Sequence, residues 1–405
     1  MTRFIFTFSF VAFVLIAQCG CRQKSKSPYQ PATLQEIRDP SQAASVNTEV
    51  TEEQAQAFAA RLHTAISNND ISTATNLVLV SRIVDRVVHA LDLSSGDETG
   101  FRKGINGNNP IKIMMVELAA AVNQGGTYEL IRTAVRGNAR HVIFRFIDVD
   151  QSMNYHDIRL VLDGGTVKGD QLFVAATGES LTETLIAAVR PAIESQQSLT
   201  GRISGDADQK VKDLEKQKEM MLAAQAGDSA KVQRLYKTLP KEVQDQKATQ
   251  IFLVQAAQTL PDEQYVAAMT EFANRFPGDP SVALMSFDRA ILQEDLKGLK
   301  SCIADLNKWT GGDDYLTLMS AAIAAQWGAT DYAKQLYQNI DSATINDAVT
   351  HEFRLTAALL SKDYSVVVEE LRIMESEYDV IFPLHTEPEF ADFVKSPEFA
   401  EYKSK

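Results

Sequence analysis

Residues 220–239 read MMLAAQAGDSAKVQRLYKTL, and this pattern of small and apolar residues around a Gly-Asp turn recurs about every 34 residues toward the C-terminus. Each copy contains a turn marker: Gly227-Asp228, Pro261-Asp262, Glu294-Asp295, Gly328-Ala329 and Lys362-Asp363. A period of this length is typical of stacked helix–turn–helix units. The stretch therefore predicts an all-helical solenoid in this part of the chain.

Four columns of residues keep step with the markers. The column before each marker is always alanine: Ala223, Ala257, Ala290, Ala324 and Ala358. The three columns after it are mostly apolar: Val232, Val266, Leu299, Ala333 and Val367; Tyr236, Thr270, Ile303, Tyr337 and Leu371; Leu239, Ala273, Leu306, Ile340 and Met374. One unit of this length cannot bury its apolar face alone, so neighbouring units are expected to stack into a surface that binds other proteins.

The period, the small residue where two helices cross, and the phrases Gly227-Asp228 and Lys362-Asp363-Tyr364 resemble the tetratricopeptide-repeat family. The resemblance covers residues 207–382 and implies five units of about 34 residues. The chain departs from the family pattern in two respects, because Gly is kept at only two turns and Thr270 interrupts an apolar column. Another helical repeat of similar length and a helical bundle without repeats are the alternatives.

The N-terminus carries a targeting pattern. Residues 1–21 contain Arg3, a mostly apolar run over residues 4–17, and the sequence Gln-Cys-Gly-Cys that ends at Cys21. The run is short for a membrane-spanning helix and indicates a secretory signal peptide. Its end resembles the processing site of bacterial lipoproteins, which implies a lipid on Cys21, with Cys19 as the alternative acceptor. Ordinary cleavage that leaves a free thiol is the alternative to lipidation.

The lipoprotein resemblance implies an exported protein, anchored to a bacterial membrane and facing the periplasm or the cell exterior. Residues 22–49 are rich in Gln, Ser, Lys and Pro, a composition typical of a flexible tether. The chain carries 53 acidic and 40 basic residues, a net charge of −13. Because so acidic a protein repels phosphate backbones, no nucleic-acid partner is expected.

Cysteine usage predicts neither a disulfide framework nor a metal site. Apart from the two cysteines of the signal region, the chain contains only Cys302. We expect Cys302 to pack as a small apolar side chain in the helical region. No Cys-His spacing typical of zinc sites is present, so no metal or cofactor is expected.

Residues 50–197 predict a different, α+β domain. Residues 51–54 and 180–183 have the form of capping boxes, and Pro110 suits the first turn of another helix. Between the helices the period changes to two, which predicts strands over residues 128–135, 141–150, 157–163 and 166–176. Helices followed by an antiparallel meander indicate a curved sheet with helices on one face.

This order of elements resembles the nuclear-transport-factor-2-like, or cystatin-like, cone. Phe144-Arg145-Phe146, Asn154-Tyr155-His156-Asp157 and residues 177–185 more narrowly resemble exported bacterial proteins that join such a domain to helical repeats. The resemblance covers about residues 125–190. It implies a fold that serves both enzymes and non-catalytic binding modules, so it leaves the function open.

Catalysis in such a cone would require a carboxylate or an imidazole in a dry pocket. The candidates are His141, Asp148, Asp150, His156 and Asp157, of which Asp148 and His156 are the polar residues expected at a cavity. Each also has a structural interpretation as a turn cap or a cross-strand hydrogen-bond partner. Because no Ser-His-Asp order, phosphate loop or metal cluster can be assembled, we favour that interpretation and expect no enzyme activity.

The sequence therefore predicts a non-enzymatic scaffold or adaptor of a cell envelope, which binds an unidentified protein through a groove of the helical repeats. Four polar or small residues recur at one position of the first helix in successive units and are expected to line this groove: Gln250, Ala283, Thr317 and His351. The alternative function is a small-ligand binder or an enzyme that uses the cavity of the cone. Residues 383–405, with Phe390, Phe393 and Phe399, are expected to cap the last unit.

Overall fold

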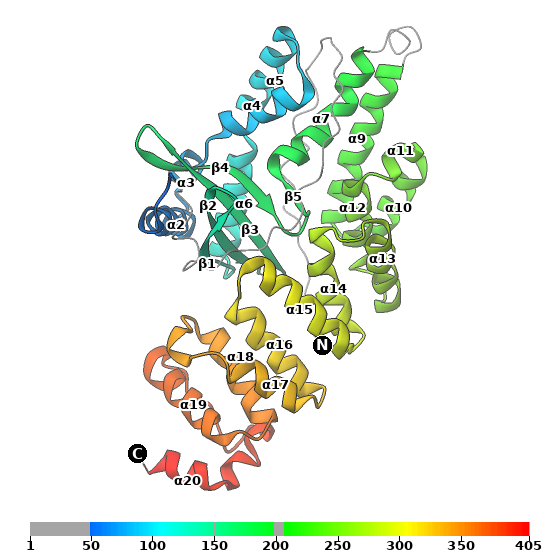
Figure 1. Ribbon diagram of the computed structural model, residues 1–405. Helices are drawn as coiled ribbons and strands as arrows, with labels where there is room; N and C mark the ends of the chain where they lie inside the picture. The colour runs from blue at the N-terminus through cyan, green and yellow to red at the C-terminus, as the bar shows by residue number, and fades with distance from the viewer. Residues whose placement is uncertain (1–48, 150, 198–205, 405) are drawn as a thin grey trace. The chain divides into compact units, whose positions relative to one another are not determined.

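The computed structural model describes residues 49–149, 151–197 and 206–404, so Cys19, Cys21 and the predicted signal peptide lie outside the described residues. The chain divides into two compact units, Met1–Asp288 and Arg289–Lys405. The first unit contains an antiparallel sheet with helices, and the remainder of the described chain is helical (Figure 1). A mixed α+β part followed by an all-helical region is therefore confirmed.

In the described residues, the sheet is a meander of five antiparallel strands in chain order. They are β1 (Thr127–Arg136), β2 (Ala139–Ile147), β3 (Met153–Asp163), β4 (Thr166–Val174) and β5 (Glu179–Ser180). Strand β3 begins earlier than the alternation predicts, because Met153 pairs with Ile147 and the chain reverses between Asp148 and Ser152. Gly137 and Gly164 adopt left-handed φ angles at the two hairpin turns, a conformation that glycine reaches without steric cost.

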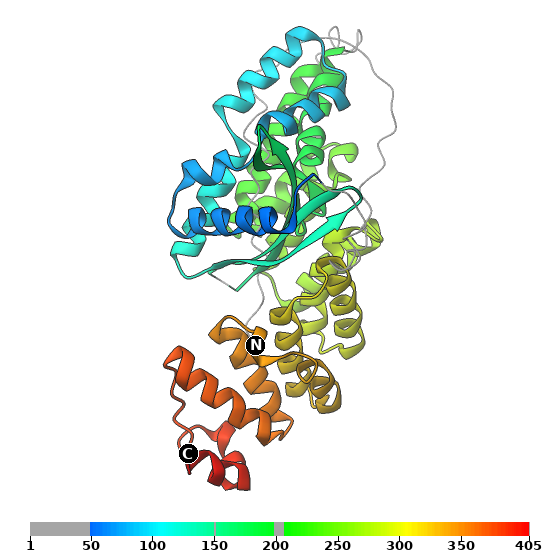
Figure 2. The ribbon, with the colours of Figure 1, turned by 60° about the vertical axis from the view of Figure 1, so that its left-hand side comes forward.

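Helices from both sides of the meander in the sequence pack on one face of the sheet, either directly or through one another. They are α2 (Glu52–Ser67), α3 (Ile71–Asn76), α4 (Val80–Leu91), α5 (Ser95–Gly107), α6 (Pro110–Asn123) and α7 (Leu181–Gln197). Helix α2, dark blue in Figure 2, lies across the sheet and contacts β1, β2 and β4, while α7 contacts β4 and β5. Phe58, Leu62, Met115, Phe144 and Leu172 belong to the single apolar core between these helices and the sheet.

The two predicted capping boxes are present. At the start of α2, Thr51 Oγ1 accepts a hydrogen bond from Gln54 N, and Gln54 Oε1 accepts one from Thr51 N. Ser180 and Glu183 form the same reciprocal pair at the start of α7. These bonds satisfy backbone N–H groups that a helix start leaves open. Local sequence thus decides where both helices begin.

The first unit continues with helices that flank the first two turn markers. They are α9 (Asp206–Gln225), α10 (Ser229–Thr238), the short α11 (Lys241–Gln244), α12 (Lys247–Ala257) and α13 (Asp262–Arg275), and α14 (Pro280–Leu292) spans the boundary between the units. Helix α9 packs against α7. Because of this contact, the division between the units lies farther along the chain than the 197–207 link between the predicted domains.

Lys247, at the start of α12, joins the sheet to these helices. Its Nζ donates to Asp279 Oδ2 at 2.8 Å and to the carbonyl of Gly178 at 3.3 Å, and lies 3.3 Å from Glu179 Oε1. A Cβ on Gly178 would stand 2.2 Å from Asp279 Oδ1. Only glycine therefore allows the turn before β5 to approach this segment of the first unit.

The second unit contains α15 (Leu296–Thr310), α16 (Asp314–Gln326), α17 (Thr330–Tyr337), α18 (Ala348–Leu360), α19 (Tyr364–Tyr378) and α20 (Pro397–Lys403). Short 3₁₀ turns lie at Ser342–Thr344, Pro388–Phe390 and Phe393–Lys395. Phe390, Phe393 and Phe399 are buried in the same cluster as Val367 and Leu371 of α19. The C-terminal segment therefore covers an apolar face of α19.

The alanine column has a backbone role at four of the turn markers. The residue four positions after the alanine has a left-handed φ of 50–78°, and these residues are Gly227, Glu294, Gly328 and Lys362. The next residue donates its N–H back to the alanine carbonyl at 2.8–2.9 Å. This pattern is the Schellman ending of an α-helix. The chain consequently reverses with the same backbone geometry at each of these turns.

The second marker differs because Pro261 occupies the position at which the other four markers have a left-handed φ. The proline ring holds φ at −52°, so the Schellman ending cannot form. Instead, Leu260 N donates to the carbonyl of Ala257. The proline thus changes how the chain enters α13.

Helix α13 consequently buries a different set of residues from the one predicted. Its buried side chains are Tyr265, Met269 and Phe272, whereas the predicted column residues Val266, Thr270 and Ala273 are half-buried. Each buried residue precedes its predicted counterpart by one position. The predicted columns are therefore wrong in the 34-residue segment that contains Pro261. The one-residue shift explains why Thr270 interrupted an apolar column.

The buried alanine at a helix turn can be tested with Ala324→Phe. Ala324 is fully buried, so a phenyl ring there would overpack α16 and cost roughly 1–3 kcal/mol of unfolding free energy. Ala304→Phe is the control, because Ala304 is exposed on α15. Chemical denaturation should show a lower stability for Ala324→Phe alone. Equal stabilities of the two variants would contradict the assigned packing.

Candidate functional site

A cleft of about 280 Å³ lies between α10, α12 and α13 of the first unit. Its apolar lining consists of Leu253, Val254, Ala257, Leu260, Ala267 and Ala268. Its polar lining consists of Gln233, Gln250, Gln264 and Glu271. Because α13 buries Tyr265 and Met269, the small side chains of Ala267 and Ala268 are left to face the cleft. A small apolar floor is thus surrounded by amide groups.

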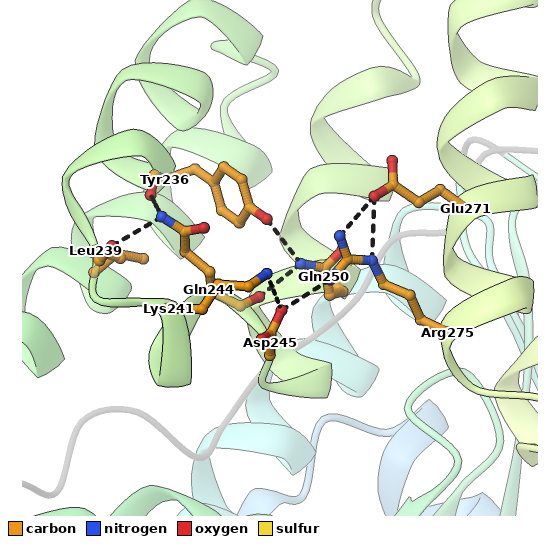
Figure 3. A network of polar contacts seen from close by, with 8 residues as sticks. All are labelled: Tyr236, Leu239, Lys241, Gln244, Asp245, Gln250, Glu271 and Arg275. Atoms are coloured by element: carbon orange, nitrogen blue, oxygen red, sulfur yellow. Dashed lines mark hydrogen bonds and ion pairs between the residues drawn. The ribbon is translucent and has the colours of Figure 1, made fainter.

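Gln250, one of the four predicted groove residues, is held in this cleft by two hydrogen bonds (Figure 3). Its Nε2 donates to the backbone carbonyl of Gln244 at 2.6 Å and to Tyr236 Oη at 3.3 Å. Gln244 is itself fixed, because its Nε2 donates to the carbonyls of Tyr236 and Leu239. The segment between α10 and α12 therefore holds the Gln250 side chain in one orientation.

This orientation leaves the Gln250 carbonyl oxygen as the group available to a ligand. A backbone carbonyl such as that of Gln244 can only accept, so the nitrogen of the Gln250 amide must face it. Among the described residues, none donates a hydrogen bond to Gln250 Oε1. The side chain is only 3 % exposed. The cleft thus presents one oriented acceptor beside its apolar floor.

Charged residues at the edge of the network are paired with one another. Arg275 donates to Glu271 Oε1 at 2.8 Å and to Asp245 Oδ1 at 3.0 Å, and Lys241 donates to Asp245 Oδ1 at 2.7 Å (Figure 3). The hydrogen bond from Lys241, together with Arg275, lowers the pKa of Asp245. These exposed pairs contribute little stability. Their consequence is that the Glu271 carboxylate at the cleft already has a cationic neighbour.

The other predicted groove residues have different surroundings. Ala283 is half-buried on α14. Thr317 is half-buried on α16, where its hydroxyl donates to the carbonyl of Asp313 and accepts from Asn307 Nδ2 at 3.2 Å. His351 is 1 % exposed in α18. Of the four, Gln250 is the residue that lines the cleft of the first unit.

His351 belongs to a buried ionic cluster of the second unit. Its Nδ1 lies 2.6 Å from Glu370 Oε2, and Arg354 pairs with the other oxygen of Glu370. Arg354 also reaches Glu369 at 3.2 Å, and the His351 ring packs against Tyr378. Glu370 is completely buried. This cluster joins α18 to α19, and each of its side chains has a partner within it, although none of the described residues accepts a hydrogen bond from Arg354 Nε.

Gln233 and Gln264, which the sequence did not single out, face the cleft from the second helices of their 34-residue segments. The predicted groove is lined by the first helix of each 34-residue segment. The cleft instead lies between α12, which is a first helix, and α10 and α13, which are second helices. A signal was present in the sequence. Pro261 cannot take the left-handed conformation that the other turn markers require, and it therefore marks the unit with the different register.

The cavity candidate His156 lies on the helix-covered face of the sheet. Its ring is 4 % exposed and stacks on Phe146 with centroids 6.3 Å apart. Its Nδ1 lies 3.3 Å from Tyr128 Oη, and the Tyr128 ring stacks on Phe144 at 4.5 Å. Burial lowers the pKa of His156 from 6.5 to about 4 and raises that of Tyr128. His156 is therefore a neutral ring packed among aromatic side chains.

The acidic candidates are placed in a turn and in an ion pair. Asp148 lies after β2, where its carboxylate accepts a hydrogen bond from Val149 N. Asp150 lies outside the described residues. Asp157 is buried, with His141 Nδ1 at 2.6 Å and Arg136 Nη1 at 3.2 Å. Burial alone would raise the pKa of Asp157, but the electrostatic interactions with His141 and Arg136, together with the hydrogen bond to His141, outweigh it and hold the pKa below its usual range.

His156 should make stability depend on pH. Its pKa is about 4 when folded and 6.5 when exposed, so the unfolded chain binds the proton more readily. The stabilisation is complete above about pH 6.5 and is lost as the pH falls toward 4, by roughly 3 kcal/mol at most. Urea midpoints across this range should fall less steeply for His156→Gln. The exposed His89→Gln serves as control, and parallel curves for all three proteins would contradict the assignment.

No protein-family model, curated protein or solved structure matches this chain. Within the described residues, no helix has both the length and the apolar composition needed to cross a membrane. The same residues contain no group of three or more His, Cys, Asp or Glu side chains arranged to hold a metal ion.

Proposed function

We propose that this protein is a non-enzymatic scaffold or adaptor of a cell envelope, which binds a segment of another protein in the cleft between α10, α12 and α13. The observation that carries the proposal is the combination of a small apolar floor with the oriented Gln250 oxygen. Concave, mostly apolar sites with a few fixed polar groups are typical of ligand recognition. Stacked helix pairs most often use such surfaces for other proteins.

The finer architecture belongs to the same proposal. The helical region is a degenerate tetratricopeptide-like solenoid, and the Schellman turns that recur with the 34-residue period support this interpretation. The sheet with its helices is a nuclear-transport-factor-2-like cone, which the order of helices and antiparallel strands supports. In this architecture, Lys247 joins the cone to the second repeat within the first unit.

The contacts of the catalytic candidates favour a binding function over an enzymatic one. A general acid or base needs a titratable group that can reach a substrate. The His156 ring is packed against Phe146 and Tyr128, and the Asp157 carboxylate is engaged by His141 and Arg136. These contacts are those of a structural core.

The proposed location depends on Cys21, which follows an apolar run and a small residue in the sequence. Replacement of Cys21 by Ser removes the thiol that would carry the lipid. The variant should move from the membrane fraction to the soluble exported fraction. Cys19→Ser is the matched control and should stay with the membrane. Membrane association of Cys21→Ser equal to that of the unmodified chain would exclude Cys21 as the anchor.

Partner binding at the cleft can be tested by photo-crosslinking in cells that make the protein. A photoreactive residue at Gln264, which is exposed at the cleft, should form a discrete adduct with a partner protein. The same residue at Lys103, exposed on α5, is the control and should not form that adduct. Ala267→Phe fills the cleft from an exposed position and should abolish the adduct at Gln264. An adduct that persists in this variant would contradict the proposal.

A further inference from the structure

From the chemistry of the cleft we infer the class of segment that it receives. The ligand is an extended, uncharged peptide segment that places one aliphatic side chain on the apolar floor and donates a backbone N–H to Gln250 Oε1. This inference rests on the proposed function, because it takes the cleft between α10, α12 and α13 as the partner site. It adds which chemical groups a segment must carry in order to bind in the cleft.

The size and composition of the floor set the first requirement. Leu253, Val254 and Leu260 provide branched apolar surface, and Ala267 and Ala268 leave room above it. A cavity of about 150 Å³ is large enough for benzene in other proteins. The volume of about 280 Å³ in this cleft therefore accommodates a Leu-sized side chain together with the peptide unit that carries it.

The oriented amide of Gln250 sets the second requirement. Its Nε2 is committed to Gln244 O and Tyr236 Oη, so the side chain offers a ligand only an acceptor. A hydrocarbon chain, an ester or a carboxylate cannot donate to Oε1 and would separate it from water without a replacement bond, which is unfavourable. A peptide N–H restores that bond. The same requirement explains why a purely apolar ligand is a poorer fit.

The rim sets the third requirement, which is the absence of net charge. Gln233 from α10 and Gln264 from α13 are neutral amides that can both donate and accept. The carboxylate of Glu271 is already paired with Arg275 at 2.8 Å. A peptide backbone presents one donor and one acceptor per residue, so it complements these amides. An extended segment leaves those backbone groups free, whereas a helix uses most of them internally.

The inference can be tested on the full mature chain with small peptide probes. N-acetyl-leucine N-methylamide should bind weakly and saturably, and its binding should shift NMR signals of α10, α12 and α13. N-acetyl-N-methyl-leucine dimethylamide keeps the side chain and the carbonyls but has no N–H. It should bind about tenfold more weakly, a ratio that corresponds to about 1.4 kcal/mol. N-acetyl-glycine N-methylamide lacks the side chain and should not bind measurably.

Two variants assign the effect to the cleft. Gln250→Met has a similar length but no acceptor, and it should bind the leucine probe and its N-methylated analogue equally. A loss of packing alone would weaken both probes without removing the difference between them. Ala267→Phe should abolish binding of both, whereas Ala60→Phe, at an exposed position of α2, should leave it unchanged. Thermal melts confirm that each variant is folded.

The outcomes separate this inference from the proposed function. Equal binding of the two leucine probes to the unmodified chain overturns the requirement for an N–H donor and leaves the cleft as a partner site. Binding that survives Ala267→Phe overturns the cleft itself, and with it the proposed function. Absence of saturable binding by the leucine probe, while crosslinking at Gln264 still captures a partner, overturns the peptide chemistry alone.

Discussion

The hydrogen bond that closes each Schellman turn onto an alanine carbonyl is the interaction on which the helical region depends. Ala223, Ala290, Ala324 and Ala358 each receive this bond from the residue five positions later. The bond fixes where one helix ends and in which direction the next one starts. Because the methyl side chain is also buried, the same residue lets the helices approach closely. One small residue thus satisfies a backbone and a packing requirement together.

The cleft lies beside the Pro261-Asp262 marker, which lacks the Schellman turn of the other four markers. Pro261 cannot adopt the left-handed φ, so α13 enters with its buried face shifted by one residue. The shift buries Tyr265 and Phe272 and leaves Ala267 at the cleft. In the 34-residue segments that follow the common turn geometry, most column residues are buried. A unit that departs from it is where small residues and amides remain to contact another molecule, which connects the irregular turn with the proposed binding function.

Two buried carboxylates elsewhere in the described part of the chain are engaged by internal partners. Glu370 is enclosed by His351 and Arg354, and Asp157 by His141 and Arg136. Removal of one partner from such a cluster would leave an uncompensated buried charge, so these groups constrain substitution without offering a reactive site. Gln250 is different, because its buried amide is satisfied at the nitrogen and open at the oxygen. That asymmetry, at a residue that lines the cleft, is why we propose Gln250 as a binding residue.

Local sequence determined the features that depend on near neighbours in the chain. The capping boxes at Thr51 and Ser180, the two-residue alternation of the strands and the helix turns at the markers were predictable, because each follows from backbone hydrogen bonds within a few residues. Only the tertiary structure decided which side chains meet across elements. It placed Gln250 beside Tyr236 and buried His351 against Glu370, although both residues occupy the same column of the repeat. The physical reason is that a column specifies a face of one helix, whereas the partners of a side chain depend on what packs against that face.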